Sequence, residues 1–164
     1  MIDVMTPADW DAVRAIYLEG IATGLATFET TAPSWADWDA THHPFGRLVA
    51  RVDGVVVGWS ALAAVSRRTC YAGVAEVSVY IAANARRGGL GRMLLDTVIA
   101  ESERHGIWTL QGGTFADNEA SLRLQAACGF RVIGRRECVA QLHGVWKDTI
   151  LTERRSRVLG VDSP

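Results

Sequence analysis

The sequence has almost no lysine. Lys147 is the only one, so the Gly-Lys pair of a Walker A loop is missing. The three cysteines, Cys70, Cys128 and Cys138, lack Cys-x-x-Cys spacing, which argues against a disulfide framework and predicts reduced, buried thiols. The sequence also lacks an apolar run of membrane length and a basic-then-apolar leader at its start. These absences predict a soluble, cytoplasmic protein without a metal site.

The positive charge that is present comes almost entirely from arginine. All but one of the 17 cationic side chains are arginines, which favours bidentate pairing with phosphate or carboxylate groups. The formal net charge of −1 gives no reason to expect general affinity for nucleic acid. With 164 residues, of which 49% are hydrophobic, the chain is long enough for one domain with a substantial core. We expect this domain over residues 1–152 and a polar C-terminal tail over residues 153–164.

Strand and helix patterns alternate along the chain. Apolar residues predict strands at residues 2–5, 47–52, 55–62, 74–81, 109–115, 130–133 and 145–151. Helices are predicted after the caps Thr6 and Ser34, and over residues 89–103 and 118–127. Asp53-Gly54 is a strong signal for a two-residue hairpin turn. This order indicates an α+β fold in which helices cover both faces of one sheet.

The most informative segment covers residues 76–92, where a strand pattern changes into a helix pattern. Val77, Val79 and Ile81 alternate with small or polar residues, and a helical face begins at Leu90. The turn Gly89-Leu90-Gly91 lies at the junction, where free backbone N–H groups and the positive helix end can hold a phosphate. A dinucleotide fingerprint does not fit, because the third glycine is missing. A glycine turn without a ligand is the alternative.

Residues 86–91, Arg-Arg-Gly-Gly-Leu-Gly, fill the pattern Gln/Arg-x-x-Gly-x-Gly/Ala. This motif resembles the acetyl-CoA loop of the GNAT N-acetyltransferases. Further segments, in order between residues 26 and 151, resemble the phosphinothricin and methionine sulfone (or methionine sulfoximine) acetyltransferases of that superfamily. They are Ala-Thr-Phe-Glu at 26–29, Arg68-x-x-Tyr71, Glu-Val-Ser-Val-Tyr-Ile at 76–81, Asn118-x-x-Ser121 with Gly129-Phe130, and His-Gly-x-Trp-x-Asp at 143–148.

The resemblance implies a GNAT-type domain, with a mixed, mostly antiparallel sheet of about six or seven strands and a splayed central strand. It implies acetyl-CoA as cosubstrate, the free amine of a small amino acid or analogue as acceptor, and a homodimer. The pantetheine arm would follow strand 76–81, where a backbone N–H near Val79 or Tyr80 would stabilise the oxyanion. Asn118 is explained equally well as a helix cap. The implied cofactor-binding residues are Val79, Tyr80, Ile81, Arg86, Arg87, Gly88, Gly89, Leu90, Gly91, Arg92 and Asn118.

Glu76 is the candidate general base. It begins the central strand, at the position where the resembling family carries its proposed base. Proton transfer to a positioned side chain is typically worth about 10²–10⁴ in rate. Burial beside Tyr71, Val74 and Trp59 would make Glu76 a stronger base. Alternatively, the carboxylate pairs only with the substrate ammonium or a nearby arginine, and a water chain carries the proton.

Substrate recognition is assigned to residues at the mouth of the same cleft. Arg67 and Arg68 suit bidentate pairing with a substrate carboxylate, although loop arginines are also common on solvated surfaces. Trp146 and His143 would close the pocket from the final hairpin, across a dimer interface as the family implies. The implied substrate-binding residues are Phe28, Glu29, Arg67, Arg68, Tyr71, Glu76, Val77, Ser78 and Trp146.

The sequence departs from the family pattern at three positions. Arg87 stands where glycine is usual, so its side chain points away from the pyrophosphate path or is used on it. Ala72-Gly73-Val74 replaces a run that in the family usually bears arginine and an aromatic residue, which predicts a wider pocket or one of changed polarity. Gln125 stands where relatives often carry His or Tyr to protonate the departing thiolate. Because glutamine supplies no proton, water or Tyr80 would have to do so.

Two other functions stay open. An acetyltransferase for peptide or protein amines would favour an open acidic groove, whereas Phe28, Trp35 and Trp146 imply an aromatic lid. A CoA-binding sensor that has lost catalysis would fit the departures at residues 72, 73 and 125, but the retention of Glu76 counts against it.

Overall fold

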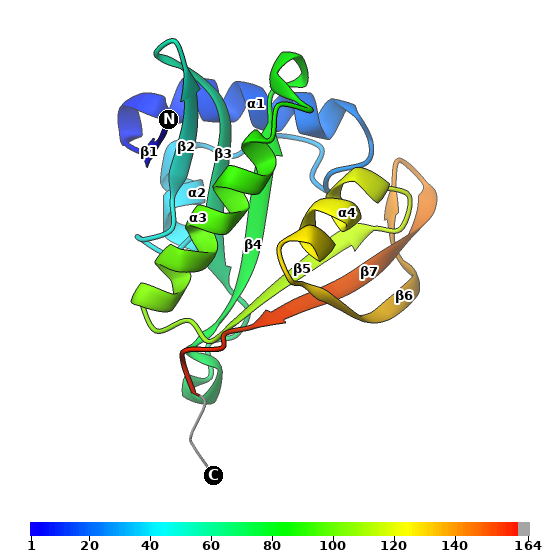
Figure 1. Ribbon diagram of the computed structural model, residues 1–164. Helices are drawn as coiled ribbons and strands as arrows, with labels where there is room; N and C mark the ends of the chain where they lie inside the picture. Colours follow the sequence, from blue (N-terminus) through cyan, green and yellow to red (C-terminus); the bar gives the residue numbers. More distant parts are fainter. Residues whose placement is uncertain (161–164) are drawn as a thin grey trace.

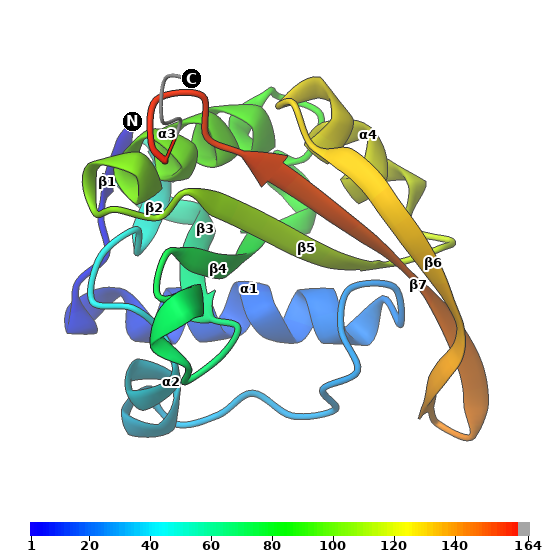
Figure 2. The ribbon, with the colours of Figure 1, turned by 90° about the horizontal axis from the view of Figure 1, so that it is seen from below.

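The computed structural model describes residues 1–160 and contains one seven-stranded sheet (Figure 1). The α-helices α1 and α2 lie on one face of this sheet and α3 and α4 on the other (Figure 2). The expected α+β fold is therefore confirmed. The strands are β1 (Ile2–Val4), β2 (Leu48–Val52), β3 (Val55–Ala64), β4 (Val74–Ile81), β5 (Thr109–Phe115), β6 (Arg131–Leu142) and β7 (Val145–Arg155). The helices are α1 (Trp10–Ala22), α2 (Trp35–Thr41), α3 (Leu90–Arg104) and α4 (Glu119–Ala127).

The strands follow the order β1-β2-β3-β4-β5-β7-β6 across the sheet. Within the described residues β4 and β5 form the one parallel pair, and every other neighbouring pair is antiparallel. A parallel pair needs a crossover connection, and here α3 provides it. The mixed, mostly antiparallel sheet implied by the sequence is thus confirmed.

Two hairpins end in two-residue turns with a left-handed backbone. Asp53 (φ 49°) and Gly54 (φ 80°) join β2 to β3, and His143 (φ 49°) and Gly144 (φ 79°) join β6 to β7. Positive φ at both central residues is the feature of a type I′ turn, whose twist matches that of the flanking strands. The hairpin predicted at Asp53-Gly54 is confirmed, and His143-Gly144 forms a turn with the same signs of φ.

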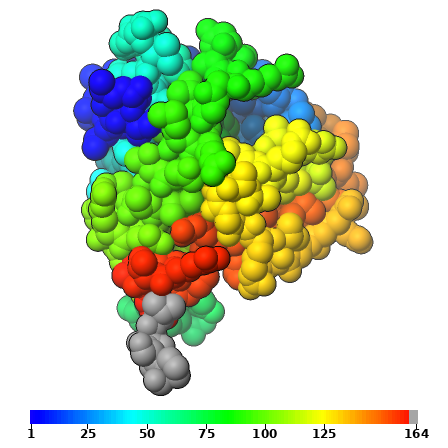
Figure 3. Space-filling view, viewed as in Figure 1, coloured from blue at the N-terminus to red at the C-terminus, as the bar shows by residue number. Residues whose placement is uncertain are grey.

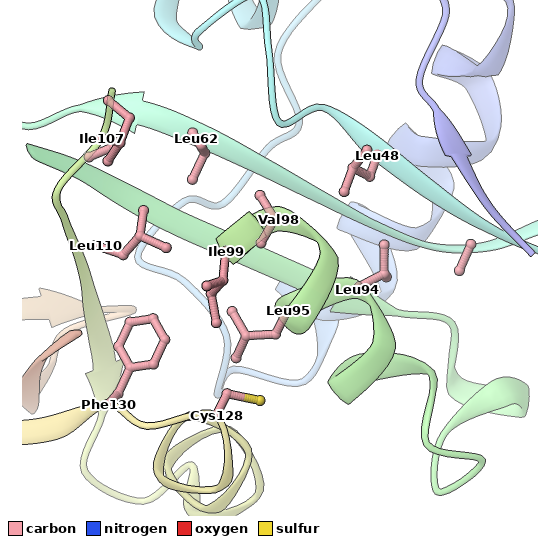
Figure 4. Packing of buried hydrophobic residues seen from close by; sticks show 12 residues of the cluster. Leu48, Leu62, Leu94, Leu95, Val98, Ile99, Ile107, Leu110, Cys128 and Phe130 are labelled. Atoms are coloured by element: carbon pink, nitrogen blue, oxygen red, sulfur yellow. The ribbon is translucent and has the colours of Figure 1, made fainter. Parts of the chain in front are cut away.

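Helix α3 packs an apolar stripe on one face of the sheet. Leu94, Leu95 and Val98 are at most 1% exposed and contact Leu62 of β3 and Leu110 of β5 in one cluster (Figure 4). Their spacing places them on one side of a helix. Burial of side chains of this size contributes about 1.5–3 kcal/mol each. This core fixes β3, β4 and β5 behind the region where β4 and β5 separate.

Tryptophans form the core on the opposite face. Trp10 of α1 lies 5.5 Å from Trp35 and 5.4 Å from Trp38 of α2 between ring centroids, and Trp38 lies 6.0 Å from Trp59 of β3. Trp38 and Trp59 are only 3% and 2% exposed. Aromatic pairs at these separations add about 0.5–1.5 kcal/mol beyond their buried area. These four tryptophans therefore attach α1 and α2 to the sheet.

The last hairpin is longer than the sequence predicted. The expected strands at residues 130–133 and 145–151 are too short, because β6 continues to Leu142 and β7 to Arg155. β6 is an edge strand with mostly exposed residues, so it lacks the apolar alternation by which buried strands are found. The expected start of the tail at residue 153 falls inside β7, where Glu153 pairs with Gln111. Residues 161–164 of that tail lie outside the described residues.

The three cysteines differ in their burial. Cys128 is buried as expected, and burial raises the pKa of its thiol to about 11. For Cys70 and Cys138 the expectation of burial is wrong, because both lie on exposed segments. Within residues 1–160, each helix is too short or too polar to cross a membrane.

Candidate active site

Strands β4 and β5 separate like the arms of a fork (Figure 1). Their pairing covers only Val74↔Thr109, Ala75↔Leu110 and Glu76↔Gln111. Beyond this point β4 continues along β3, and β5 continues along β7. Each strand then has one edge without a neighbouring strand, and its N–H and C=O groups can bind an extended ligand there. The splayed central strand implied by the resemblance is confirmed.

A cavity of about 1600 Å³ occupies the fork. In Figure 3 a hollow lies between the green segment before α3 and the yellow α4. Most of the residues assigned from the sequence meet here, on walls formed by β4, the loop before α3, the segment after α1, and α4. Those that line the cavity are Phe28, Glu29, Glu76, Val77, Ser78, Val79, Tyr80, Ile81, Arg86, Arg87, Leu90, Gly91 and Asn118.

The loop between β4 and α3 forms one end of the cavity. Arg87 (φ 69°) and Gly89 (φ 79°) both adopt the left-handed backbone region, so Arg87 takes the conformation that glycine adopts most easily. Gly89 is the N-cap of α3 and no side chain caps the helix, which leaves backbone N–H groups free at its positive end. A Cβ on Gly91 would lie 3.2 Å from Leu124, so glycine allows α4 to approach. This geometry fits a pyrophosphate, with Arg86 nearby.

Glu76 lies where the fork opens. It is the last residue of β4 that pairs with β5, and alternation along the strand places its side chain on the same face as those of Ser78 and Tyr80. The carboxylate lines the cavity, but Glu76 is exposed. The expected burial of Glu76 is therefore wrong. Tyr71, which was expected to cover it, is itself 45% exposed on the segment before β4.

Aromatic side chains form the wall beside Glu76. Tyr80 stacks on Trp59 at 4.6 Å between ring centroids and meets Tyr17 edge-on at 5.1 Å. Gly20 of α1 makes room for this ring, since a Cβ there would lie 2.8 Å from Tyr80 Cδ1. Burial raises the pKa of Tyr80 well above its ordinary value. The phenol therefore stays protonated at neutral pH and can donate a hydrogen bond.

Asn118 is a helix cap in this structure. Its Oδ1 accepts a hydrogen bond from the backbone N–H of Ser121 at 3.2 Å, which confirms the capping interpretation. Its Nδ2 also donates to the carbonyl oxygen of Leu25 at 2.9 Å. Asn118 thus ties the start of α4 to the segment that follows α1.

Gln125 is occupied by hydrogen bonds and is only 8% exposed. Its Nε2 donates to Thr114 Oγ1 at 2.8 Å and to Ser121 Oγ at 3.2 Å, while its Oε1 accepts from the hydroxyl of Thr152. The amide therefore ties α4 to β5 and β7.

Replacement of Gln125 by methionine should cost stability without changing proton transfer. The variant leaves the hydroxyl of Thr114 without its partner in a buried site, so we expect the free energy of unfolding to fall by about 1–3 kcal/mol. The pH profile of kcat should be unchanged, because glutamine does not titrate. Urea titration and rate measurements over a range of pH test both points. Wild-type stability combined with an altered pH profile would contradict the structural role.

Four of the assigned substrate residues do not line the cavity. Arg67, Arg68 and Tyr71 lie on the exposed segment between β3 and β4, where the guanidinium of Arg68 is 5.7 Å from the centre of the Tyr71 ring. Trp146 is 57% exposed at the start of β7. Their roles stay predictions.

Three loop residues and the unusual run at residues 72–74 are also outside the lining. Gly88 and Gly89 shape the turn, and Arg92 pairs with Asp96 at 3.4 Å. Residues 72–74 do not line the cavity, and the expectation that their small side chains widen the pocket or change its polarity stays a prediction. Gly73 is instead buried against Trp108.

Sequence reasoning missed the far wall of the cavity, which β5, β6 and β7 form together. Phe115, Arg136 and Thr149 line this wall, and Phe28 meets Phe115 edge-on at 4.6 Å. No motif indicated Arg136, since β6 was predicted to end before it. The described residues include no group of three or more His, Cys, Asp or Glu side chains that could hold a metal ion.

The Acetyltransferase (GNAT) family model matches residues 10–130 of the chain. Because this match covers most of the sequence, the protein belongs to the GNAT acetyltransferase family and is an N-acetyltransferase. It is 36% identical to the phosphinothricin N-acetyltransferase of Alcaligenes faecalis over 162 residues, which cover 93% of this chain and 81% of the relative. It is 28% identical to the L-methionine sulfoximine/L-methionine sulfone acetyltransferase of Pseudomonas aeruginosa, over 86% of each chain.

Two solved structures extend this comparison. The phosphinothricin acetyltransferase of Sinorhizobium meliloti, in complex with AcCoA, has a TM-score of 0.89 and 26% identity, over 100% of this chain and 92% of its own. The ribosomal-protein-alanine N-acetyltransferase of Brucella melitensis has a TM-score of 0.86 and 32% identity, over 95% of this chain and 99% of its own. These names indicate different acceptors on one fold, so the acceptor has to be argued from the site.

Proposed function

We propose that the protein transfers the acetyl group of acetyl-CoA to the free amine of a small amino acid or amino-acid analogue of the phosphinothricin or methionine sulfone type. The observation that supports this most directly is the fork with the cavity that it encloses. An anion-binding loop lies at one end, Glu76 lies where the arms part, and the free edge of β4 connects them. This order of groups matches acetyl-CoA, in which a pyrophosphate is followed by a pantetheine arm and then by the thioester.

Acetyl-CoA would be bound mainly by backbone groups. The pyrophosphate would rest on the N–H groups of the loop at residues 87–92, with the side chains of Arg86 and Arg87 adding positive charge. The pantetheine arm would pair with the free edge of β4. A backbone N–H near Val79 or Tyr80 would then face the thioester oxygen, where a preorganised donor can lower the activation free energy by about 3 kcal/mol. Asn118 would reach the arm only if it releases Leu25.

Glu76 would take the proton from the acceptor amine. The carboxylate is exposed in the free protein, and an acceptor bound in the fork would displace water from it and bring the amine within hydrogen-bonding distance. The departing thiolate needs a proton that Gln125 does not supply. Tyr80, whose phenol stays protonated, or a water molecule in the cavity would provide it.

A segment held against β5 and α4 at one wall of the cavity supports a small acceptor. The segment after α1 packs through Phe28 on Phe115, and Leu25 accepts the hydrogen bond from Asn118. A peptide would need this segment to move aside. Acetylation of a peptide or protein amine, and a sensor that binds CoA without catalysis, are the alternatives.

Thiol release from acetyl-CoA tests this proposal. The acceptor panel contains methionine sulfone, methionine sulfoximine, phosphinothricin, common amino acids and a short peptide. We expect the highest kcat/KM on the sulfone-type or phosphinothricin-type acceptors. A higher value on the peptide would favour the protein acetyltransferase. Tight acetyl-CoA binding without turnover on any acceptor would favour the sensor.

We also propose that the protein forms a homodimer in the cytoplasm. Val132, Val145 and Trp146 are 63%, 60% and 57% exposed on the last hairpin, and such apolar side chains suit contact with a second copy. In a dimer Trp146 could close the partner's cavity, whereas Arg67 and Arg68 would need their segment to move toward the acceptor. Light scattering should give twice the chain mass of 17.8 kDa, and a monomer at assay concentration would contradict the dimer.

A further inference from the structure

Arg136 is a cation on the cavity wall without a partner in the described chain. It extends from β6, and its side chain makes no hydrogen bond or ion pair within residues 1–160. Three other cations of the same hairpin each pair with a carboxylate. Arg131 pairs with Glu153, Arg135 with Asp148, and Lys147 with Asp117. Arg136 is therefore available to an anion from outside the chain.

Strand register places Arg136 beside two residues of the cavity. Thr149 of β7 lies directly opposite both Arg136 of β6 and Phe115 of β5. Directly opposite residues share one face of a sheet, so the three side chains stand in a row on the face that carries Phe115 and Phe28. Gly113 precedes Phe115 by two residues and shares this face. A Cβ built on Gly113 meets nothing within 4 Å, so the floor beside Thr149 is open.

Thr149 presents a polar group that lacks a partner. The residue is 6% exposed and lines the cavity, and its Oγ1 has no hydrogen-bond partner within the described residues. A buried hydroxyl without a partner is costly and therefore uncommon in folded proteins. A ligand that accepts a hydrogen bond from Thr149 Oγ1 would remove this cost. A guanidinium and a hydroxyl in adjacent positions together match the two oxygens of a carboxylate.

We propose that Arg136, Thr149 and the open floor at Gly113 form the subsite for the α-carboxylate of the acceptor. This assignment rests on the proposed function. Glu76 faces the same side of the sheet from the other arm of the fork, through its pairing with Gln111. An α-amino acid carries its amine and its carboxylate on one carbon. The two groups are therefore close together, and the long side chains of Glu76 and Arg136 would have to reach toward each other across the cavity to hold the amine and the carboxylate.

The subsite is distinct from the region proposed for the phosphates of CoA. Arg86 and Arg87 lie on the loop before α3, at the end of β4, whereas Arg136 lies two strands beyond β5 at the edge of the sheet. Loss of Arg136 should therefore weaken binding of the acceptor and leave binding of acetyl-CoA unchanged.

Steady-state kinetics with two matched acceptors test the subsite. Methionine sulfone has one anionic group, its α-carboxylate, and its α-carboxamide has none. For Arg136→Gln we expect the KM for methionine sulfone to rise about tenfold or more, because a charge-assisted hydrogen bond is lost. The KM for the carboxamide and the KM for acetyl-CoA should stay within about twofold of the wild-type values. Arg131→Gln, on the same strand but outside the cavity lining, is the control and should change neither constant.

Thr149→Val gives a second, independent readout. Valine keeps the shape and removes the unpaired hydroxyl, so Tm should stay constant or rise, while the KM for methionine sulfone rises roughly twofold to tenfold. A fall in Tm together with an unchanged KM would overturn the role of Thr149.

Different results would contradict the subsite and the proposed function. An unchanged KM for methionine sulfone in Arg136→Gln, an equal loss on both acceptors, or a raised KM for acetyl-CoA would overturn the subsite while the acetyltransferase function stands. Absence of wild-type turnover on every acceptor of the panel would overturn the proposed function, and this assignment with it.

Discussion

Glu76→Gln is expected to lower kcat on a sulfone-type acceptor by about 10²-fold or more, since a positioned base typically contributes 10²–10⁴ in rate. Glutamine keeps the shape and polarity of the side chain but does not accept a proton at neutral pH. The KM for acetyl-CoA should change little, because Glu76 lies where the fork opens and not on the loop before α3. Initial rates of thiol release, with both substrates varied, measure these constants.

The pH dependence of this variant separates a base from a binding partner. At a pH that deprotonates the free amine, a base is no longer needed, so the deficit of Glu76→Gln should shrink. Glu137→Gln, an exposed carboxylate on β6 outside the cavity lining, is the control and should behave as wild type. A deficit that is constant over pH, with a raised acceptor KM, would show that Glu76 only pairs with the ammonium group.

Gly73→Ala is expected to lower the free energy of unfolding by about 1–3 kcal/mol, as overpacking of a filled site does. A Cβ at residue 73 would lie 2.1, 2.2 and 2.4 Å from three atoms of the Trp108 ring. The Trp108 ring therefore has to move, or the backbone at the start of β4 has to shift. In a chain of this length each kcal/mol corresponds to roughly 2–4 °C in Tm, which calorimetry resolves.

The position of Gly73 makes this variant a test of the fork as well. Its carbonyl oxygen accepts from the backbone N–H groups of Trp108 at 2.8 Å and Thr109 at 3.0 Å, at the base where β4 and β5 meet. The control is Gly134→Ala on β6, where an added Cβ meets nothing within 4 Å, and its Tm should stay close to that of wild type. Equal Tm values for Gly73→Ala and Gly134→Ala would contradict the packing role of Gly73.

Local features of the sequence were sufficient for most of the fold. The turn at Asp53-Gly54 and the cap at Ser34 depend on a few adjacent residues, and both form as predicted. The change of period near Leu90 likewise predicted the end of a strand and the start of α3. The prediction failed on β6, whose residues are largely exposed, because burial is what imposes the alternation that reveals a strand.

The candidate site was found from the sequence where it follows one continuous segment. The strand from Glu76 to Ile81 and the loop at residues 86–91 are contiguous, so a motif could identify them before the structure did. The burial of each side chain, and whether it reaches the cavity, could not be predicted from the motif. Glu76 is exposed although burial was expected, and Arg67 and Arg68 lie outside the cavity lining.

The sequence by itself thus determined the order of the elements, the glycine turn before α3 and the family, because periodicity, caps and motifs are properties of neighbouring residues. Only the tertiary structure decided which distant side chains share the cavity. Arg136 and Thr149 are neighbours because β6 and β7 pair in one register, and a shift by one residue would place them on opposite faces. The register shifts between Arg136 and Ala140, so the local turn at His143-Gly144 does not fix it; the pairing of β7 with β5, which joins distant parts of the chain, leaves no local pattern.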